Sequence, residues 1–363
     1  MATQHRTKVE VDRDSARLMR HLHRVQRRRG SLPEPQVLVR GPGLELTFGD
    51  QELPFHAASV GKVMTATLIG MLLEQGRFDV STPIGRLLPE RDLAGLPAAA
   101  GVTVSTDVTV EHLLTHTSGL PDYFEPPRGT DTAASATSVV ADRDRYWSSA
   151  DLLEEVRHLP PVGRPGERFA YGDTAYVLLG RIAEEATGQT FSQLLRELIF
   201  DPAGMAHSST PYSDARSSED VAHLRIAPFW LGREELSTAL AVSVDWAGGG
   251  IVSTPDDLVR FQTALHGDRF VSEELREWMA RPRHRLRPGI HYGAGLVTLR
   301  FGGFFPLLRN LPQPVGGIGA FATQMFYYPR QETHVVLNFH SSRQMARSVR
   351  THIRIAQVIA RRS

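Results

Sequence analysis

Residues 59–76 read SVGKVMTATLIGMLLEQG and predict an apolar helix that opens with Ser59 and Lys62 and ends at Gly76. Two residues three positions apart lie on the same face of a helix, so the serine hydroxyl and the lysine ammonium can touch. The positive end of the helix dipole lies beside the serine, where it would stabilise an oxyanion. This pair is therefore a candidate for nucleophilic catalysis.

Taken alone, the same letters also fit a helix-capping serine followed by a surface lysine. The composition favours the chemical interpretation, because Lys8 and Lys62 are the only lysines and the other 39 of the 41 basic residues are arginine. A buried ammonium can lose its proton near neutral pH, whereas a guanidinium cannot. A lysine inside an apolar segment of this chain therefore calls for a chemical explanation.

The size and charge of the chain limit its class. It has 363 residues, 41% of them hydrophobic and 22% charged. At roughly 100–200 residues per domain, this length predicts two domains or one two-lobed unit. The 41 basic and 40 acidic residues leave a formal charge of +1. This overall charge offers no argument for nucleic acid or an anionic membrane as a partner.

Several functions are excluded or disfavoured by what the sequence lacks. It contains no cysteine, which excludes disulfides, thiol catalysis and thiolate metal sites. The fifteen histidines are scattered without a His-Glu-x-x-His pattern, so we expect no metal and no cofactor. The first thirty residues hold no apolar run typical of a signal peptide. The longest apolar stretch, 63–73, is shorter than the ~20 residues that span a bilayer. We therefore expect a cytoplasmic protein without a membrane span.

Hydrophobic periodicity and turn signals predict strands near both ends of the chain and helices between them. The predicted helices are 11–28, 59–75, 110–116, 151–158, 174–187, 191–199 and 342–361, and the predicted strands are 36–40, 44–48, 295–301, 321–328 and 333–339. This order predicts an α+β fold with an N-terminal helix, a sheet lobe built from both termini and an inserted helical lobe. We place these three units at 1–31, at 32–58 with 245–363, and at 59–244. A long polar stretch between Tyr123 and Trp147 predicts a loop that is either a lid or disordered.

Further motifs follow the Ser-x-x-Lys pair in a specific order. They are HLLTHTSGLPDY at 112–123, RPGE at 164–167, YGDTAYVLLG at 171–180, DPAGM at 201–205, and AGGGIVST at 247–254 followed by Asp257-Leu258. In this order they resemble the serine β-lactamase-related superfamily, which includes class C β-lactamases, D-alanyl-D-alanine peptidases and esterases. The resemblance covers roughly residues 32–345.

The resemblance implies a β-lactamase/transpeptidase-like fold, with an antiparallel sheet flanked by helices and a catalytic cleft between the lobes. It implies that Ser59 is the acylated nucleophile and Lys62 its activating partner. Tyr171 matches the tyrosine that takes and returns the serine proton in the class C and esterase branch, although a packed aromatic residue is the alternative. We interpret His116 as a loop histidine with structural hydrogen bonds rather than as a catalytic one. The HTSG and AGGG motifs look structural.

Two positions depart from the family pattern. Asp173 stands where an asparagine is usual, and an aspartate near Lys62 would favour the charged ammonium. We therefore expect Lys62 to stay cationic and Tyr171 to act as the base. Pro314 stands where the family has a cationic lysine or histidine before the glycine that corresponds to Gly316. A backbone oxyanion donor from Gly317, paired with the Ser59 amide, remains possible. His284, His291 or Arg309 could replace the lost cation.

These observations predict a serine hydrolase that forms an acyl-enzyme on Ser59 with a small-molecule ester or amide. The loss of the cation argues for a neutral ester, so an esterase is preferred to a β-lactamase or D-amino-acid peptidase-like amidase. A transacylase is a close variant. The alternative of another class is a catalytically inactive binding protein on the same fold, and the sequence leaves the oligomeric state open.

Overall fold

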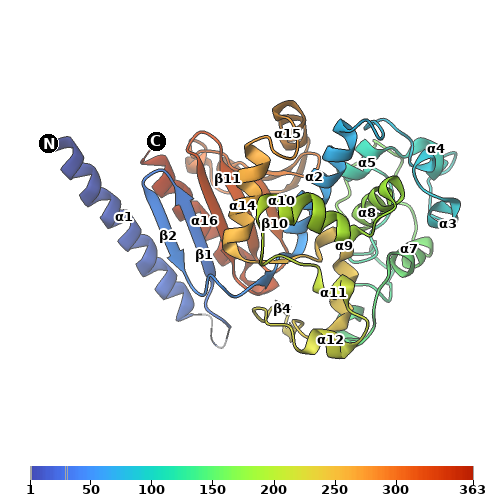
Figure 1. Ribbon diagram of the computed structural model, residues 1–363, viewed down its shortest axis with the longest axis horizontal. Coiled ribbons are helices and arrows are strands. Elements are labelled where there is room, and N and C mark those ends of the chain that lie inside the picture. Colours follow the sequence, from blue (N-terminus) through green and yellow to red (C-terminus); the bar gives the residue numbers. More distant parts are fainter. Residues whose placement is uncertain (1, 29, 31, 363) are drawn as a thin grey trace.

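The computed structural model describes residues 2–28, 30 and 32–362 and contains an eight-stranded antiparallel sheet with helices on both of its faces (Figure 1). In spatial order the strands are β2 (Leu44–Phe48), β1 (Gln36–Gly41), β12 (Thr333–Asn338), β11 (Thr323–Tyr328), β10 (Val315–Gly319), β9 (Val297–Leu299), β8 (Ile290–Tyr292) and β7 (His284–Arg287). The two strands nearest the N-terminus thus pair directly with the last strand of the chain. This arrangement confirms the predicted α+β class and a sheet built from both termini.

Strand β2 shows why this sequence forms a sheet edge. Leu44, Leu46 and Phe48 are buried, whereas Glu45 and Thr47 are exposed. This alternation matches the period of two that a strand needs when only one of its faces is covered. β11 and β12 are buried on both faces, and they pair antiparallel across the turn at 329–332.

The two faces of the sheet support separate hydrophobic cores. On one face, α1 (Ala2–Gln26) and α16 (Met345–Ala360) pack on β1, β2, β11 and β12. Leu22 of α1 and Ile355 of α16 are fully buried in this core. On the other face, α14 (Pro255–His266) packs on β1, β11 and β12. α1 begins earlier than the predicted 11–28 helix, while residues 1, 29 and 31 lie outside the described part of the predicted N-terminal unit.

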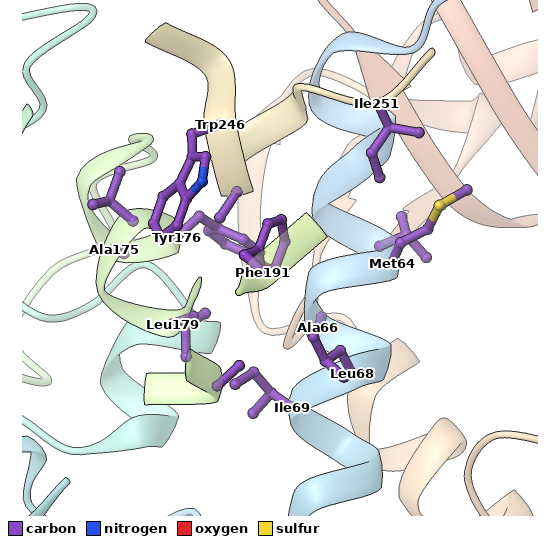
Figure 2. Packing of buried hydrophobic residues seen from close by; sticks show 14 of the residues in the cluster. Met64, Ala66, Leu68, Ile69, Ala175, Tyr176, Leu179, Phe191, Trp246 and Ile251 are labelled. Carbon is purple, nitrogen blue, oxygen red and sulfur yellow. The ribbon is translucent and has the colours of Figure 1, made fainter. Parts of the chain in front are cut away.

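Helix α2 (Gly61–Glu74) lies at the centre of the larger core and is buried around most of its circumference. α2 packs against α8 (Thr174–Thr187) and α13 (Trp246–Gly249), and Figure 2 shows its Ile69 on the side of Leu179 of α8, while its Met64 lies on the opposite side of the helix. A helix that is apolar all round must be enclosed by other elements. This enclosure decides the environment of Lys62, which α2 carries in its first turn.

The remaining elements connect or flank these two cores. The helical ones include α3 (Glu90–Leu93), α4 (Val104–Asp107), α5 (Val110–Leu114), α7 (Ser149–Arg157), α9 (Phe191–Leu194), α10 (Asp201–Ala203), α11 (Pro211–Asp214), α12 (Ser218–Ala222) and α15 (Glu273–Ala280). Two small ladders pair β3 (Phe55–His56) with β6 (Val252–Ser253) and β4 (Trp230–Leu231) with β5 (Glu234–Glu235). β7 and β8 were not expected, because the arginine-rich sequence around them has no apolar alternation.

The segment between Tyr123 and Trp147 is packed rather than disordered, so that predicted alternative was wrong. Tyr123, Ala134, Val139 and Trp147 are buried in the larger core, and α6 (Ser138–Ala141) lies within the segment. The Thr132 hydroxyl donates to the Tyr123 carbonyl at 2.6 Å. A few well-spaced apolar side chains anchor this otherwise polar stretch, and composition alone does not reveal them.

Among the described residues, no helix combines the length and the apolar character that crossing a lipid bilayer requires.

Candidate active site

Ser59 lies in a single 3-10 turn, Ala58–Val60, that leads directly into α2. The preceding Ala58 has a φ of 49°, in the left-handed region that costs a residue with a Cβ about 1–2 kcal/mol. Its backbone N–H donates to Nδ1 of buried His56 at 3.1 Å. The strained turn is thus held in place by a specific hydrogen bond, and it presents a half-buried Ser59 at the start of the helix.

Lys62 is buried, with only 2% of its side chain exposed. Its ammonium donates to Ser59 Oγ at 3.2 Å, to the Gly248 carbonyl at 2.7 Å and to the Asp173 carboxylate. An ammonium has three protons, so these three acceptors use its full donor capacity. Burying an ammonium costs several kcal/mol unless it is paired and hydrogen-bonded, which this arrangement achieves.

These contacts keep Lys62 charged. Burial alone would lower the pKa of its ammonium, but the nearby Asp173 carboxylate raises that pKa above the ordinary lysine value. A lysine in this state holds and polarises the serine oxygen but cannot accept its proton. Lys62 is therefore not available as a base in this arrangement.

Tyr171 lies beside Lys62 and is the candidate for a proton acceptor at this site. The Lys62 Nζ atom lies 5.2 Å from the centre of the Tyr171 ring, and the ring is half-buried. Burial raises the pKa of the Tyr171 phenol above its ordinary value, while Lys62 and hydrogen bonds with Ser59 and Lys62 act in the opposite direction. The resting phenol is therefore protonated at neutral pH. Its phenolate, once formed, has the Lys62 cation beside it.

His116 belongs to the wall of this site. Its ring packs against Tyr171 in a tilted arrangement, with centroids 4.5 Å apart, and its Nδ1 accepts the Gly172 N–H at 3.4 Å. Burial, followed by the nearby Lys62, holds the pKa of His116 well below its ordinary value, so the ring is neutral. The geometry agrees with a histidine that orients the Tyr171 segment.

Two further carboxyl groups surround the Lys62–Asp173 pair, and neither was singled out from the sequence. Asp122 accepts the Asp173 N–H at 2.7 Å, and Asp245 faces His56 at 3.5 Å. Burial, followed by repulsion from Asp173, raises the pKa of each to about 7. Three carboxyl groups surround one ammonium, of which Asp122 and Asp173 are buried and Asp245 is half-buried. They cannot all ionise without a large cost in free energy, so Asp122 and Asp245 are close to protonation at neutral pH.

The AGGG motif explains how so many groups fit around α2. A Cβ at Gly248 would lie 2.4 Å from Asp173 Oδ1, and one at Gly249 would lie 2.7 Å from the Ala58 carbonyl carbon. Any side chain there would separate the lysine from its acceptors or move the 58–60 turn. The motif therefore has a structural requirement for glycine, and Gly248 also supplies an acceptor.

The β10 glycines lie along the same helix end. A Cβ at Gly317 would face Val60 and Val63, whereas one at Gly319 would lie 3.3 Å from the Ser59 nitrogen. The Leu299 N–H donates to the Pro314 carbonyl, and backbone groups alternate along a strand. The Gly317 N–H therefore points toward β11, and the amides of Ile318 and Ala320 point toward the free edge of β10. Gly316 pairs with Val297 of β9 and Phe326 of β11.

Of the residues considered as substitutes for the lost cation, only His284 is close to the wall of the site, where it contributes to the lowered pKa of His116. His284 on β7 stacks on Phe169, with centroids 5.0 Å apart, and His291 is on β8. Arg309 lines a surface hollow beside Ala360, at the end of α16. Within residues 2–28, 30 and 32–362, no cluster of three histidine or carboxylate side chains could hold a metal ion.

Comparison with known proteins agrees with this geometry. The Beta-lactamase family matches residues 50–359. Penicillin-binding protein 4* of Bacillus subtilis (strain 168) is 30% identical over 294 residues, covering 76% of this chain and 58% of that protein. The D-alanyl-D-alanine-carboxypeptidase/endopeptidase AmpH of Escherichia coli (strain K12) is 31% identical over 287 residues, 76% of this chain and 67% of that protein. The chain thus spans less than two thirds of the length of penicillin-binding protein 4*.

Solved structures show the same fold. The D-amino acid amidase from Ochrobactrum anthropi SV3, complexed with L-phenylalanine amide, superposes with a TM-score of 0.76 at 22% identity, over 98% of this chain and 100% of that one. EstCE1, described as a hydrolase with promiscuous acyltransferase activity, superposes with a TM-score of 0.72 at 19% identity, over 95% of this chain and 98% of that one. Since the family match covers most of the sequence, the chain belongs to the beta-lactamase family of serine hydrolases.

Proposed function

We propose that this chain hydrolyses neutral carboxylic esters through an acyl-enzyme on Ser59. The observation that carries the proposal is the coordination of Lys62. Its ammonium donates to Ser59 Oγ and to two other acceptors, with Tyr171 beside it. The serine is therefore oriented and polarised by a group that stays cationic, next to a phenol able to exchange a proton.

In the proposed reaction, the Tyr171 phenolate accepts the Ser59 proton as Oγ bonds to the ester carbonyl carbon. Collapse of the tetrahedral intermediate breaks the bond to the leaving alkoxide, which takes the proton back from Tyr171. A water molecule then attacks the acyl-enzyme by the same route and releases the acid. Lys62 stabilises each phenolate form by charge. Since burial raises the Tyr171 pKa, we expect activity to increase with pH.

We assign the oxyanion donors to the backbone N–H groups of Ser59 and Ala320. Support comes from Gly319, which brings the end of β10 against the Ser59 nitrogen, and from the strand alternation that directs the Ala320 N–H toward the free edge. Gly317, the donor expected from the sequence, lies two residues before Gly319 on β10, beside Val60 and Val63.

A neutral ester is favoured over a β-lactam or a D-alanyl peptide by the composition of β10. Residues 314–319 read PVGGIG and carry no cation for a substrate carboxylate. The likeness to the D-amino acid amidase and to EstCE1 makes amide hydrolysis and acyl transfer the competing outcomes of the test.

The test begins with a fluorophosphonate and intact-mass measurement on the wild type and Ser59→Ala. We expect one adduct on the wild type and none on the variant. A panel of a p-nitrophenyl ester, a D-amino-acid amide and a chromogenic cephalosporin then ranks the substrate classes by kcat/KM. Product analysis with an added alcohol separates transfer from hydrolysis.

Faster turnover of the amide or the cephalosporin would overturn the ester assignment while leaving the acyl-enzyme intact. The absence of an adduct on folded wild-type protein would overturn the proposal that this chain is an enzyme, and would favour an inactive protein that binds a ligand or partner.

A further inference from the structure

The overall charge of +1 conceals a strong segregation along the chain. After Glu277, residues 278–363 contain thirteen arginines and a single acidic residue, Glu332. This segment alone therefore carries a formal charge of +12, and the rest of the chain carries −11. The near-zero net charge of the whole chain is therefore compatible with an anionic partner that binds residues 278–363.

The arginines of α16 converge with those of α1 on one surface. A groove of about 550 Å³ runs between the two helices. Five arginine side chains line it, and we call it the arginine groove: Arg24, Arg28, Arg347, Arg350 and Arg354. None of its lining residues is acidic. In Figure 1, α1 and α16 lie at the end of the molecule that is far from α7 and α8.

These guanidinium groups are largely unused within the protein. Arg347 donates to the side chain of Gln344 at 2.7 Å. Across the described part of the chain, the side chains of the other four form no hydrogen bond or ion pair. Arg24, Arg28, Arg350 and Arg354 are also exposed. Unpaired arginines that share one concave surface are suited to bind phosphate oxygens, because each presents a planar pair of donors.

The pKa of His21 reflects the positive charge of the arginine groove. It lies in the groove and bonds to Thr351 of α16 at 3.1 Å, which ties α1 to α16. Burial lowers the pKa of His21 to about 4, and the adjacent Arg354 and Arg24 contribute to the shift. The cations are therefore close enough to repel a further positive charge.

An exposed apolar lip borders the groove. Phe305 is 63% exposed and Leu307 is 96% exposed, and both belong to its lining. Phe305 precedes the short 3-10 turn Pro306–Leu308, and Leu307 lies within that turn. A soluble anion would gain nothing from two solvent-exposed apolar side chains, whereas a lipid bilayer offers phosphates and an apolar layer side by side.

We propose that the arginine groove and its apolar lip dock this protein onto the surface of a bilayer containing anionic phospholipid. The arginines bind lipid phosphates, while Phe305 and Leu307 enter the boundary between headgroups and acyl chains. Docking is peripheral and reversible, since neither element spans the bilayer. This inference is independent of the chemistry at Ser59.

The test is cosedimentation of the full chain with vesicles of phosphatidylcholine alone or mixed with phosphatidylglycerol. We expect binding to the anionic vesicles, at least about tenfold stronger than to the neutral ones and weakened by salt. R350E with R354E should reduce it by about tenfold or more, and F305S with L307S should reduce it at unchanged charge. The matched control is R225E with R233E, two exposed arginines near α12 and β4 whose loss should leave binding unchanged.

Three results would overturn the proposal. One is equal binding to both vesicle types, and another is an equal loss of binding in the control variant. The third is full competition by free glycerol phosphate or an oligonucleotide together with unimpaired binding of F305S/L307S, which would assign the groove to a soluble anion or a nucleic acid. Retained turnover of a soluble ester and an unchanged circular dichroism spectrum verify that each variant is folded.

Discussion

Lys62 and the arginine groove place positive charge in opposite environments. The Lys62 ammonium is buried and donates to three acceptors, whereas four of the five groove arginines are exposed and have no hydrogen-bond or ion-pair partner among the described residues. Burial makes each charge at the first site expensive, so the carboxyl groups around it are brought close to protonation. In the arginine groove, water solvates each guanidinium at little cost in free energy, so these cations remain available to an external anion.

The contrast explains the choice of residue at each place. A compact ammonium donates in three directions from one point, which fits the converging acceptors around Lys62. A guanidinium presents a flat fork that matches phosphate oxygens, which fits an open groove. In a chain whose basic residues are almost all arginine, the lysine at position 62 occupies the site where three acceptors converge on one nitrogen.

The largest expected effect comes from removing the buried cation. Lys62→Met should abolish turnover, by about a thousandfold or more, because Ser59 and the Tyr171 phenolate both lose their positive partner. It should also destabilise the fold by about 3–5 kcal/mol, since Asp173 would be buried without a counterion. Urea unfolding and ester hydrolysis measure the two effects separately.

The double variant K62M/D173N separates the two roles, because it removes the unpaired charge along with the lysine. It should regain most of the stability and none of the activity. Activity in the double variant would contradict the assignment of Lys62. Arg354→Met is the matched control in the other region, with an expected change within about 0.5 kcal/mol.

The second effect is a shift in pH dependence. Asp173→Asn removes a carboxylate that raises the pKa of both Lys62 and Tyr171, so both values should fall. The kcat/KM profile should therefore move to lower pH as a whole. A profile that coincides with that of the wild type would show that Asp173 does not set these pKa values. Asp142→Asn, an exposed position, serves as the control.

Sequence alone predicted the part of this site that short-range patterns encode. Helical spacing brought Ser59 to Lys62, and the family order added Tyr171 and Asp173, all of which the structure brings together. The Gly248 carbonyl, Asp122 and Asp245 were missed, since their approach to Lys62 depends on how α13 and the 116–123 segment pack on α2. β10 was not among the strands predicted from periodicity, because three of its five residues are glycine.

The elements of the fold were likewise predicted where the sequence has apolar periodicity, and missed where it does not. The hairpin of β11 and β12 and the terminal helix followed from apolar periodicity. β7 and β8 lack that periodicity, because their side chains are largely arginine and histidine on an exposed edge. The division into lobes at 59 and 244 stays a prediction. The charge segregation was readable from the sequence, but a total of +1 obscured it.

A smaller effect concerns stability at the buried carboxyl groups. Asp245 ionises near 4 in the unfolded chain, whereas burial and Asp173 raise its pKa to about 7 in the folded protein. The wild type therefore loses stability from this group as the pH rises through that window, and Asp245→Asn does not. The melting temperature of the variant should exceed that of the wild type by a few degrees at about pH 8, and by less at about pH 5. An advantage independent of pH would mean that Asp245 does not titrate in this range.

The smallest expected effect is a change in the pKa of His21, which lies in the solvent-exposed arginine groove. Arg354→Gln removes one neighbouring cation, so the pKa of His21 should rise from about 4. The rise should be partial, because burial is the larger cause and Arg24 remains. Titration of the His21 ring protons by NMR measures it, and Arg225→Gln is the control. Stability and ester turnover should stay unchanged, since exposed arginines without partners contribute little to either. A His21 pKa that does not move would mean that water and salt already screen the groove, and the two regions would then differ in burial alone.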